Sequence, residues 1–351
     1  MPPDACHAAA PTLAEKVTFL STSAAYPDKP GRMTRRETHM SWVFFADDTV
    51  YKLKKPVRLS YLDFSTLSRR EAACRAEVAL NQRLAPGVYR DVVALTQAGA
   101  DLALDGQGEV VDWLVRMQRL DEARTLEAQL RAGGAADLDV GSLADLLARF
   151  YGHAPAVRRS PAAHLVKWQA LLGETRRVLL DPRLGLPSGL VRYVLAVQDR
   201  FLRTRAKMLA RRCGDGRIVE AHGDLRPEHV WMGPPVKIID RLEFSVELRT
   251  VDWADELASL EVEMERLGAA PAGLRLRRHV LATLDDRPPP ELYLFYRSYR
   301  ALLRARFAIA HLLEPQPRTP EKWPRQARDY LAIAARDARQ LQRRLRRPRD
   351  R

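Results

Sequence analysis

The residues best suited to chemistry lie in one segment, EAHGDLRPEHVWMGPPVKIIDRLEF, residues 220–244. Asp224 follows His-Gly, His229 lies five residues further on, and Asp240 ends an apolar run. A carboxylate on a loop can accept the proton of an attacking hydroxyl group, and a carboxylate at the end of a strand can hold a metal ion. Phosphoryl transfer from ATP needs these groups and little covalent help, so the segment is compatible with that chemistry.

A group of lysines precedes this segment and is suited to binding phosphate. Residues 41–55, SWVFFADDTVYKLKK, read as two strands around a turn at Asp47-Asp48. Side chains alternate along a strand, so Lys52 and Lys54 share one face of the second strand. A lysine exposed to solvent with no ligand is the alternative interpretation.

A helix is predicted over residues 65–84, directly after the lysines. Glu77 has apolar residues at i−4, i+3 and i+7, so we expect its face to meet the sheet. Glu71 lies among arginines and is expected to be more exposed. For Glu77, an ion pair with Arg75 or Arg83 is the alternative.

The remaining elements fall into two groups. Strand-like runs come first, at residues 88–96, 101–104 and 109–120. Helical patterns follow, near residues 123–132, 141–152, 162–180, 190–212, 251–267, 272–284, 291–313 and 321–345. One strand-like island, residues 217–240, interrupts the helices. Separate blocks of strands and helices indicate an α+β fold, with a β-rich lobe containing one helix and a mostly helical lobe.

The catalytic segment resembles that of a known family. HGDLRPEHV resembles the HGDxxxxN loop of aminoglycoside phosphotransferases and related kinases, and IID resembles their metal-binding strand. ETHMSW, YKLKKP, LDFSTL, LNQRLAP and HGDLRPEH follow one another as in a bacterial subgroup of uncharacterised proteins of this type. The resemblance covers roughly residues 35–313 and implies a bilobal protein-kinase-like fold. It also implies that Asp224 is the catalytic base and that Asp240 binds Mg²⁺.

His229 departs from the family pattern, because it stands where the family has the asparagine that is the second metal ligand. Mg²⁺ prefers oxygen ligands, whereas imidazole suits softer metals. Four alternatives stay open. His229 ligates Mg²⁺ weakly, the site favours Mn²⁺, His229 contacts phosphate directly, or the neighbouring Glu228 acts instead.

The resemblance also assigns residues that bind the nucleotide. It implies that Lys52 holds the α- and β-phosphates and that a helix glutamate, for which we choose Glu77, pairs with it. No GxGxxG precedes the strand, so hydroxyl and amide groups of RRETHMSW, including Ser41, are expected to cover the phosphates. A hinge is expected at residues 115–117, where backbone groups of Arg116 would contact adenine. There Met117 packs either on the base or in the core.

Four regions are expected from these patterns: an N-terminal extension (1–34), a nucleotide-binding N-lobe (35–120), a helical C-lobe (121–345) and a basic tail (346–351). Acidic residues of the stretch 252–265 follow the metal strand. Asp252 and Asp255 are expected to cap a helix there, and a link from Asp252 to the catalytic loop is the alternative. The same stretch could also supply an acidic pocket for a cationic acceptor.

Composition restricts the class of protein. The chain of 351 residues carries a net charge of +14 and has three cysteines without a CxxC pair, so neither a disulfide framework nor a structural zinc site is expected. It has no run of 18 apolar residues and no basic segment followed by an apolar one at its start. We therefore expect no membrane span, no secretory signal and a cytoplasmic location.

A basic protein favours anionic partners. No helix-turn-helix or zinc-finger pattern is present and aromatic residues make up only 7%, which argues against nucleic-acid binding. The expected function is ATP-dependent transfer of phosphate to a hydroxyl group of a small molecule. The alternatives are a nucleotide-binding pseudokinase or regulatory protein, phosphorylation of proteins, and nucleic-acid binding. The acceptor and the oligomeric state are not indicated.

Overall fold

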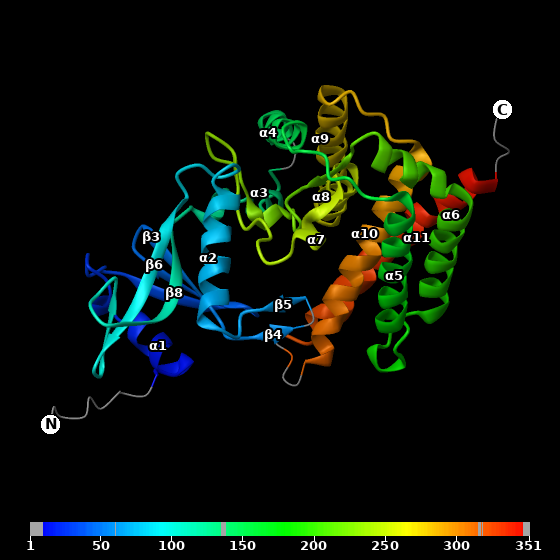
Figure 1. Ribbon diagram of the computed structural model, residues 1–351. Helices are drawn as coiled ribbons and strands as arrows, with labels where there is room; N and C mark the ends of the chain where they lie inside the picture. Colours follow the sequence, from blue (N-terminus) through cyan, green and yellow to red (C-terminus); the bar gives the residue numbers. More distant parts are fainter. Residues whose placement is uncertain (1–9, 60, 135–137, 315–316, 318, 347–351) are drawn as a thin grey trace. The chain divides into compact units, whose positions relative to one another are not determined.

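A computed structural model describes residues 10–59, 61–134, 138–314, 317 and 319–346. The chain divides into two compact units (Figure 1). Unit 1 comprises residues 1–124 and 237–246, and unit 2 comprises residues 125–236 and 247–351. The predicted basic tail lies almost wholly outside the described residues, as does the start of the predicted N-terminal extension. Among the described residues, no helix is long and apolar enough to cross a membrane.

Unit 1 is built on an antiparallel sheet of six strands, which run in the order β1-β2-β3-β8-β6-β7. The strands are β1 (Met33–Glu37), β2 (Ser41–Ala46), β3 (Thr49–Lys54), β6 (Tyr89–Ala98), β7 (Asp101–Leu104) and β8 (Glu109–Gln118). The predicted turn at Asp47-Asp48 joins β2 to β3, and Asp47 adopts a positive φ of 48° there. A short hairpin, β4 (Arg58–Leu59) with β5 (Leu62–Asp63), follows β3.

The two faces of this sheet are covered by different helices. Helix α1 (Leu13–Leu20) and the 3₁₀ turn η1 (Ser23–Ala25) pack on one face, where their apolar side chains join a core with Leu53 and Leu114. The predicted helix is α2 (Leu67–Asn81), and it packs on β6 and β8 at the other face (Figure 1). The expected N-terminal extension is therefore, in its described part, a layer of the unit 1 core.

Residues 237–246 join unit 1 through their backbone. Ile238 donates its N–H to the carbonyl of Leu84 at 3.1 Å. Asp240 donates its N–H to the hydroxyl of Tyr89 at 2.9 Å, and Arg241 donates to Oδ1 of Asn81 at 2.9 Å. The segment from β11 to Asp240 is thereby fixed beside the end of α2 and the start of β6.

Unit 2 is mostly helical, as the pattern predicts, and the predicted α+β class is confirmed. Its main helices are α3 (Leu126–Arg131), α4 (Val140–Gly152), α5 (Pro161–Leu179), α6 (Ser188–Gly214), α8 (Trp253–Arg266), α9 (Ala270–Thr283), α10 (Pro290–Ala310) and α11 (Lys322–Arg346). Short elements connect them: η3 (Pro182–Leu184), β9 (Ile218–Glu220), η4 (Pro227–His229), β10 (Val230–Trp231), β12 (Thr250–Asp252) and η5 (His311–Leu313). Three further short elements lie at the borders of the units: the 3₁₀ turn η2 (Glu122–Arg124), the strand β11 (Lys237–Ile238) and the helix α7 (Val246–Arg249).

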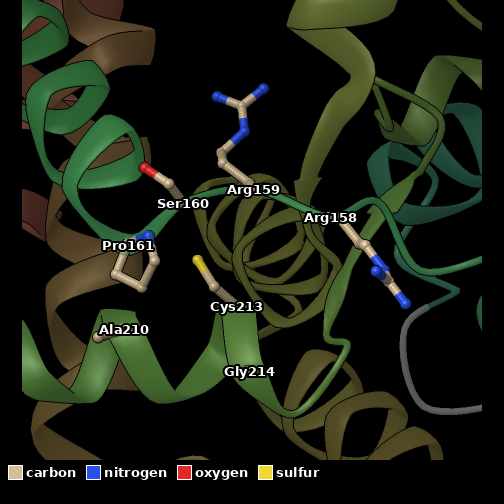
Figure 2. A pocket seen from close by; sticks show the side chains of 7 residues that line it. All are labelled: Arg158, Arg159, Ser160, Pro161, Ala210, Cys213 and Gly214. Carbon is tan, nitrogen blue, oxygen red and sulfur yellow. The ribbon is translucent and has the colours of Figure 1, made fainter.

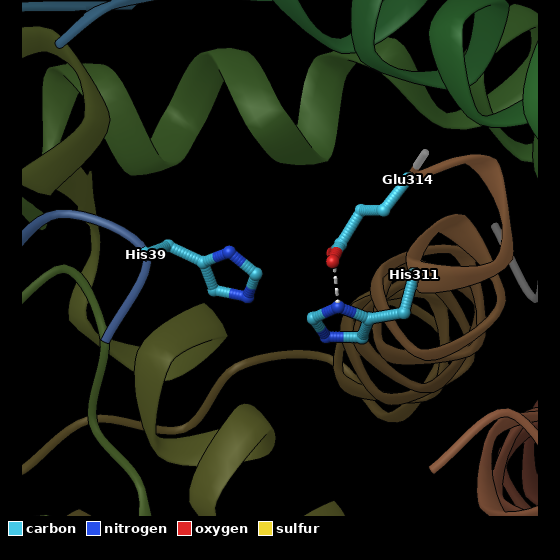
Figure 3. A group of neighbouring side chains, drawn as sticks. All are labelled: His39, His311 and Glu314. Carbon is cyan, nitrogen blue, oxygen red and sulfur yellow. Dashed lines mark hydrogen bonds and ion pairs between the residues drawn. The ribbon is translucent and has the colours of Figure 1, made fainter. Parts of the chain in front are cut away.

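Helix α8 lies at the centre of unit 2, where every residue from Trp253 to Met264 is buried. Aromatic side chains join the other helices, since Phe201 of α6 stacks on Phe295 of α10 with ring centres 4.4 Å apart. At the end of α10, His311 Nδ1 forms a hydrogen bond of 2.6 Å with Glu314 (Figure 3), and the His311 ring stacks on Trp323 of α11. The stack of His311 on Trp323 therefore joins the end of α10 to α11.

Candidate active site

Strand β3 places two lysines beside one glutamate of α2. Lys52 Nζ lies 2.8 Å from Glu77 Oε1, and Lys54 Nζ lies 2.6 Å from Glu77 Oε2. The two lysines share a face, as the strand alternation predicts, and Glu77 is completely buried. Glu71 instead pairs with Arg75 at the surface of α2. The ion pair that Glu77 makes is therefore with the strand and not with its own helix.

Each lysine also reaches a carboxylate of the segment that follows β11. Lys52 Nζ lies 2.7 Å from Asp240 Oδ1, and Lys54 Nζ lies 2.5 Å from Glu243 Oε1. We call Lys52, Lys54, Glu77, Asp240 and Glu243 the lysine–carboxylate cluster. The side chain of Lys54 is 1% exposed and that of Lys52 is 16% exposed, whereas the side chain of Asp240 is 45% exposed. The cluster is thus open to solvent at its Asp240 end and closed at Lys54.

Burial and charge act against each other in the cluster. Burial alone would lower the pKa of Lys52, but the negative charges of Asp240 and Glu77 raise that pKa well above its usual value. Burial would raise the pKa of Glu77, yet the two lysines lower it. Burial raises the pKa of Glu243. Lys52 and Glu77 are therefore held in their charged forms.

Asp240 has an unusual backbone conformation, with a φ of 62° in the left-handed region. Aspartate visits this region more readily than most side chains do. The hydrogen bond from its N–H to the buried Tyr89 hydroxyl helps to hold that conformation. Strained backbone of this kind often occurs where a side chain must be aimed at a ligand.

The predicted catalytic loop lies in unit 2 and is fixed by a residue that sequence analysis missed. The backbone N–H groups of His222 and Gly223 donate to the Glu256 carboxylate at 3.0 and 2.6 Å. The hydroxyl of Tyr151 donates to the same carboxylate at 2.9 Å. Gly223 has a φ of 92°, which a glycine adopts without strain. The turn that presents Asp224 is therefore determined by the buried Glu256.

Asp224 and His229 contact each other through the loop backbone. His229 Nδ1 lies 2.9 Å from the carbonyl of Asp224 and donates a hydrogen bond to it. The side chain of Asp224 is 43% exposed, and Nη1 of Arg226 lies 3.9 Å from its carboxylate. The hydrogen bond to Asp224 orients the His229 ring in the way that metal-binding histidines are usually oriented.

The covering segment predicted around Ser41 is a tight turn between β1 and β2. The N–H of Ser41 donates to Oγ1 of Thr38 at 2.9 Å, and the N–H of Thr38 donates to the Ser41 carbonyl at 2.8 Å. Ser41 lies opposite Lys54 in the strand register and is buried. It is therefore on the sheet face that carries the two lysines, although its own side chain is not at the surface.

The predicted hinge at residues 115–117 is wrong, because these residues lie inside β8. That strand pairs with β3 on one side and β6 on the other, so its backbone groups are used by the sheet. Arg116 lies opposite Tyr51 in the register and pairs with Asp91, on the face away from Lys52. Met117 lies on the Lys52 face and packs half-buried against the core below α2.

The alternative role of Asp252 is also wrong. Its carboxylate caps α8 through the N–H of Ala254 at 2.9 Å and binds Arg212 at 2.6 and 2.8 Å. Asp255 pairs with Arg300 inside unit 2. The link to the catalytic loop comes from Glu256, one helical turn after Asp252. The sequence signal for this contact was the position of Glu256, four residues after the residue that caps the helix.

A hollow of about 360 Å³ lies in unit 2 between the start of α5 and the end of α6 (Figure 2). Its lining residues are Arg158, Arg159, Ser160, Pro161, Ala210, Cys213 and Gly214. None of the predicted site residues lines it. Arg159 pairs with Glu247, and Ser160 caps α5 through the N–H of Ala163. The hollow is therefore separate from the predicted chemistry.

Comparison with known proteins gives relatives of unknown activity. No protein-family profile matches the chain. Uncharacterized proteins of Mycobacterium bovis and Mycobacterium tuberculosis are each 30% identical to it over 289 residues. The match covers 80% of this chain and 56% of each relative, so the chain spans just over half their length.

Solved structures give a clearer result for the fold. A choline kinase from Cryptosporidium parvum has a TM-score of 0.54 at 9% identity, with 94% of this chain and 96% of that chain covered. A choline/ethanolamine kinase family protein from Mesorhizobium loti has a TM-score of 0.51 at 15% identity, with 93% and 99% covered. The GDP complex of aminoglycoside 2′-phosphotransferase-IIIa has a TM-score of 0.52 at 14% identity, with 92% and 98% covered. The chain therefore has the kinase-like fold of these small-molecule kinases.

Proposed function

We propose that this protein transfers the γ-phosphate of ATP to a hydroxyl group of a small molecule. The observation that carries the proposal is the position of Lys52, whose Nζ lies between the buried Glu77 and the exposed Asp240. A lysine held by a helix glutamate beside a metal-binding aspartate is the arrangement that kinases use for the phosphates of ATP. The fold shared with small-molecule kinases supports the same proposal.

Exposure favours Lys52 over Lys54 as the lysine that binds phosphate. Lys54 is buried and has both Glu77 and Glu243 as partners, so a phosphate cannot reach it without a rearrangement. Lys52 lies at the open end of the cluster and has an exposed partner. It can exchange its contact with Asp240 for a contact with phosphate oxygen, because an ammonium group on a flexible chain is not tied to one geometry.

The sequence resemblance supports Asp240 as a ligand of the metal ion, and it supports His229 as a second ligand. The exposed carboxylate of Asp240 is an oxygen donor of the kind that Mg²⁺ prefers, and the His229 ring is oriented by Asp224. If the imidazole of His229 is one of the ligands, Mn²⁺ is a second candidate for the bound metal ion. The metal would neutralise charge on the phosphate oxygens during transfer.

Asp224 would act as the base for the acceptor hydroxyl. Its carboxylate is exposed and its loop is fixed by the hydrogen bonds to Glu256, so it can receive a proton without the loop moving. The acid-rich stretch 252–265 offers no support for a cationic acceptor. Its inward carboxylates already have partners inside unit 2, since Asp255 pairs with Arg300, Glu263 pairs with Arg304 and Glu256 accepts from the loop backbone.

A nucleotide-binding protein without turnover is the second candidate function. It is favoured by His229, which replaces an oxygen ligand with a nitrogen ligand at the proposed metal site. This alternative predicts that a nucleotide raises the melting temperature of the protein although no phosphate is transferred.

A screen of hydroxyl compounds tests the proposed function. Release of ADP from ATP, or of GDP from GTP, is followed with each acceptor, in Mg²⁺ and in Mn²⁺. We expect release that depends on the acceptor and that disappears in Asp224→Ala. The matched control is Asp215→Ala, an exposed aspartate at the end of α6. Stabilisation by nucleotide without release in either metal would favour the second candidate.

A further inference from the structure

The lysine–carboxylate cluster contains an ion pair that the proposed role of Lys52 does not use. Lys54 and Glu243 contact each other at 2.5 Å, and their side chains are 1% and 9% exposed. Lys54 Nζ also lies 5.0 Å from the centre of the Phe64 ring. Burying a charged pair this deeply has a large desolvation cost, which the close contact and the second contact of Lys54 with Glu77 help to offset.

The geometry shows two parallel bridges between α2 and residues 240–243. The two oxygens of Glu77 bind different lysines, and each lysine continues to a different carboxylate. One bridge ends on Asp240 and the other ends on Glu243, three residues later in the same segment. Only the bridge through Lys52 lies near solvent.

Binding of a nucleotide would disturb one bridge and not the other. Lys52 would give up its contact with Asp240 when it binds phosphate, and Asp240 would turn from Lys52 to the metal ion. Glu77 would then be a buried carboxylate with a weakened partner, which is strongly unfavourable. Lys54 keeps its contact with Glu77 because its own position is away from the open end.

We propose that Lys54 and Glu243 are positioning residues of the nucleotide site. Their bridge holds Glu77 and residues 238–243 in place while Lys52 and Asp240 exchange their mutual contact for a metal-bound nucleotide. The identity of the ligand rests on the proposed function, whereas the positioning of the segment does not. The backbone bonds of Ile238, Asp240 and Arg241 to unit 1 report directly on that position.

Hydrogen exchange without any ligand tests the positioning. The variants are Lys54→Met and the isosteric Glu243→Gln. The matched control is Lys16→Met, which removes a different buried lysine that pairs with Asp112 at 2.8 Å. In both test variants we expect the amides of residues 238–243 to exchange about tenfold faster or more, with little change in the control. Unchanged exchange in both test variants would overturn the proposal, and Glu243→Gln decides the outcome if Lys54→Met does not fold.

Nucleotide affinity gives a readout that a purely structural role would not change selectively. We expect both variants to weaken binding of Mg²⁺–ADP about tenfold or more, as loss of residues that orient metal ligands does. Binding of metal-free ADP should change much less. The double variant Lys54→Met/Glu243→Gln should be no weaker than Lys54→Met alone, because both changes break one bridge.

The two proposals fail in different ways. If the wild-type protein binds no nucleotide, the proposed function is wrong, and the exchange measurement still decides whether Lys54 and Glu243 hold the segment. If the wild-type protein binds Mg²⁺–ADP and the variants bind it equally well, Lys54 and Glu243 are not positioning residues and the proposed function stands. If the two substitutions weaken the affinity for Mg²⁺–ADP independently, so that their fold-changes multiply in the double variant, Lys54 and Glu243 do not act through one bridge.

Discussion

Both units bury charged groups, but the lysine–carboxylate cluster of unit 1 and helix α8 of unit 2 rely on different cations. In unit 1 the carboxylates Glu77, Asp240 and Glu243 are paired with lysines. In unit 2 several carboxylates of α8 and the carboxylate of its cap, Asp252, are paired with arginines, whereas Glu256 holds the catalytic loop. These pairs include Asp252 with Arg212, Asp255 with Arg300, Glu261 with Arg297 and Glu263 with Arg304.

The difference matters because lysine and arginine bind carboxylates differently. The guanidinium group is a rigid fork that fixes a carboxylate through two bonds, whereas the ammonium group is a compact charge on a flexible chain. Arg212 uses its fork on Asp252 at 2.6 and 2.8 Å, deep inside unit 2. Lys52 makes single contacts and has one exposed partner. The arginine–carboxylate pairs of unit 2 therefore fix its helices in place. In the lysine–carboxylate cluster of unit 1, the contact of Lys52 with Asp240 can be exchanged for a contact with a ligand.

The largest expected effect breaks the arginine network. Arg212→Met removes the partner of both Asp252 and Asp286 and leaves two buried carboxylates. We expect the free energy of unfolding to fall by about 3–5 kcal/mol, measured by urea unfolding. Arg203→Met, an exposed residue of the same helix, should change it by less than about 0.5 kcal/mol. A loss below about 1 kcal/mol in Arg212→Met would contradict the assigned role of the network.

The second prediction concerns the response of unit 2 to acid. Burial lowers the pKa of His164 from 6.5 to about 4. Between these values the unfolded chain binds a proton that the folded chain does not, so stability falls as the pH falls from 6.5 to about 4. The loss from this one group amounts to about 3 kcal/mol.

Replacement of the histidine isolates this effect. His164→Phe should remove that part of the pH dependence, whereas the exposed His153→Phe should retain it. The measurement is the free energy of unfolding at several pH values from 7 to 4 for the three proteins. Parallel curves for His164→Phe and the wild type would show that His164 does not control the response.

The third prediction tests the exchangeable charge of unit 1. Lys52→Met should lower the affinity for Mg²⁺–ATP about 100-fold, which corresponds to about 2.7 kcal/mol. The stability of the protein should change much less, because Glu77 retains Lys54. Calorimetric titration and thermal unfolding measure the two quantities. A large loss of stability with unchanged affinity would make Lys52 a structural residue like Arg212.

The smallest expected effect is at the surface of α2. Glu71 and Arg75 form an exposed i,i+4 pair at 2.8 Å. Arg75→Ala should lower the free energy of unfolding by less than about 0.5 kcal/mol and leave nucleotide affinity unchanged. A larger effect on affinity would mean that α2 responds to charges outside the lysine–carboxylate cluster.

Local patterns predicted the elements and some of the contacts well. The helices of unit 2 begin and end close to the predicted residues, because apolar periodicity and caps are local signals. The shared face of Lys52 and Lys54 and the burial of Glu77 also follow from periodicity alone. The roles proposed for these residues stay predictions.

Contacts between distant segments could not be predicted in this way. Glu243 meets Lys54 across 189 positions of sequence, and Glu256 meets Gly223 only because α8 is buried behind the loop. The hinge at Arg116 was misplaced because the sequence of β8 does not show that its neighbours on both sides are strands. The link assigned to Asp252 failed for a similar reason, since Arg212 comes from α6.

The central claim is that Asp240 and Lys52 bind a nucleotide together with a metal ion. Titration of ATP into the wild-type protein and into Asp240→Asn, each with and without Mg²⁺, tests it most directly. We expect Mg²⁺ to strengthen binding to the wild type about tenfold or more and to have little effect on Asp240→Asn. Equal dependence on Mg²⁺ in the two proteins, or no binding of ATP to the wild type, would contradict the claim.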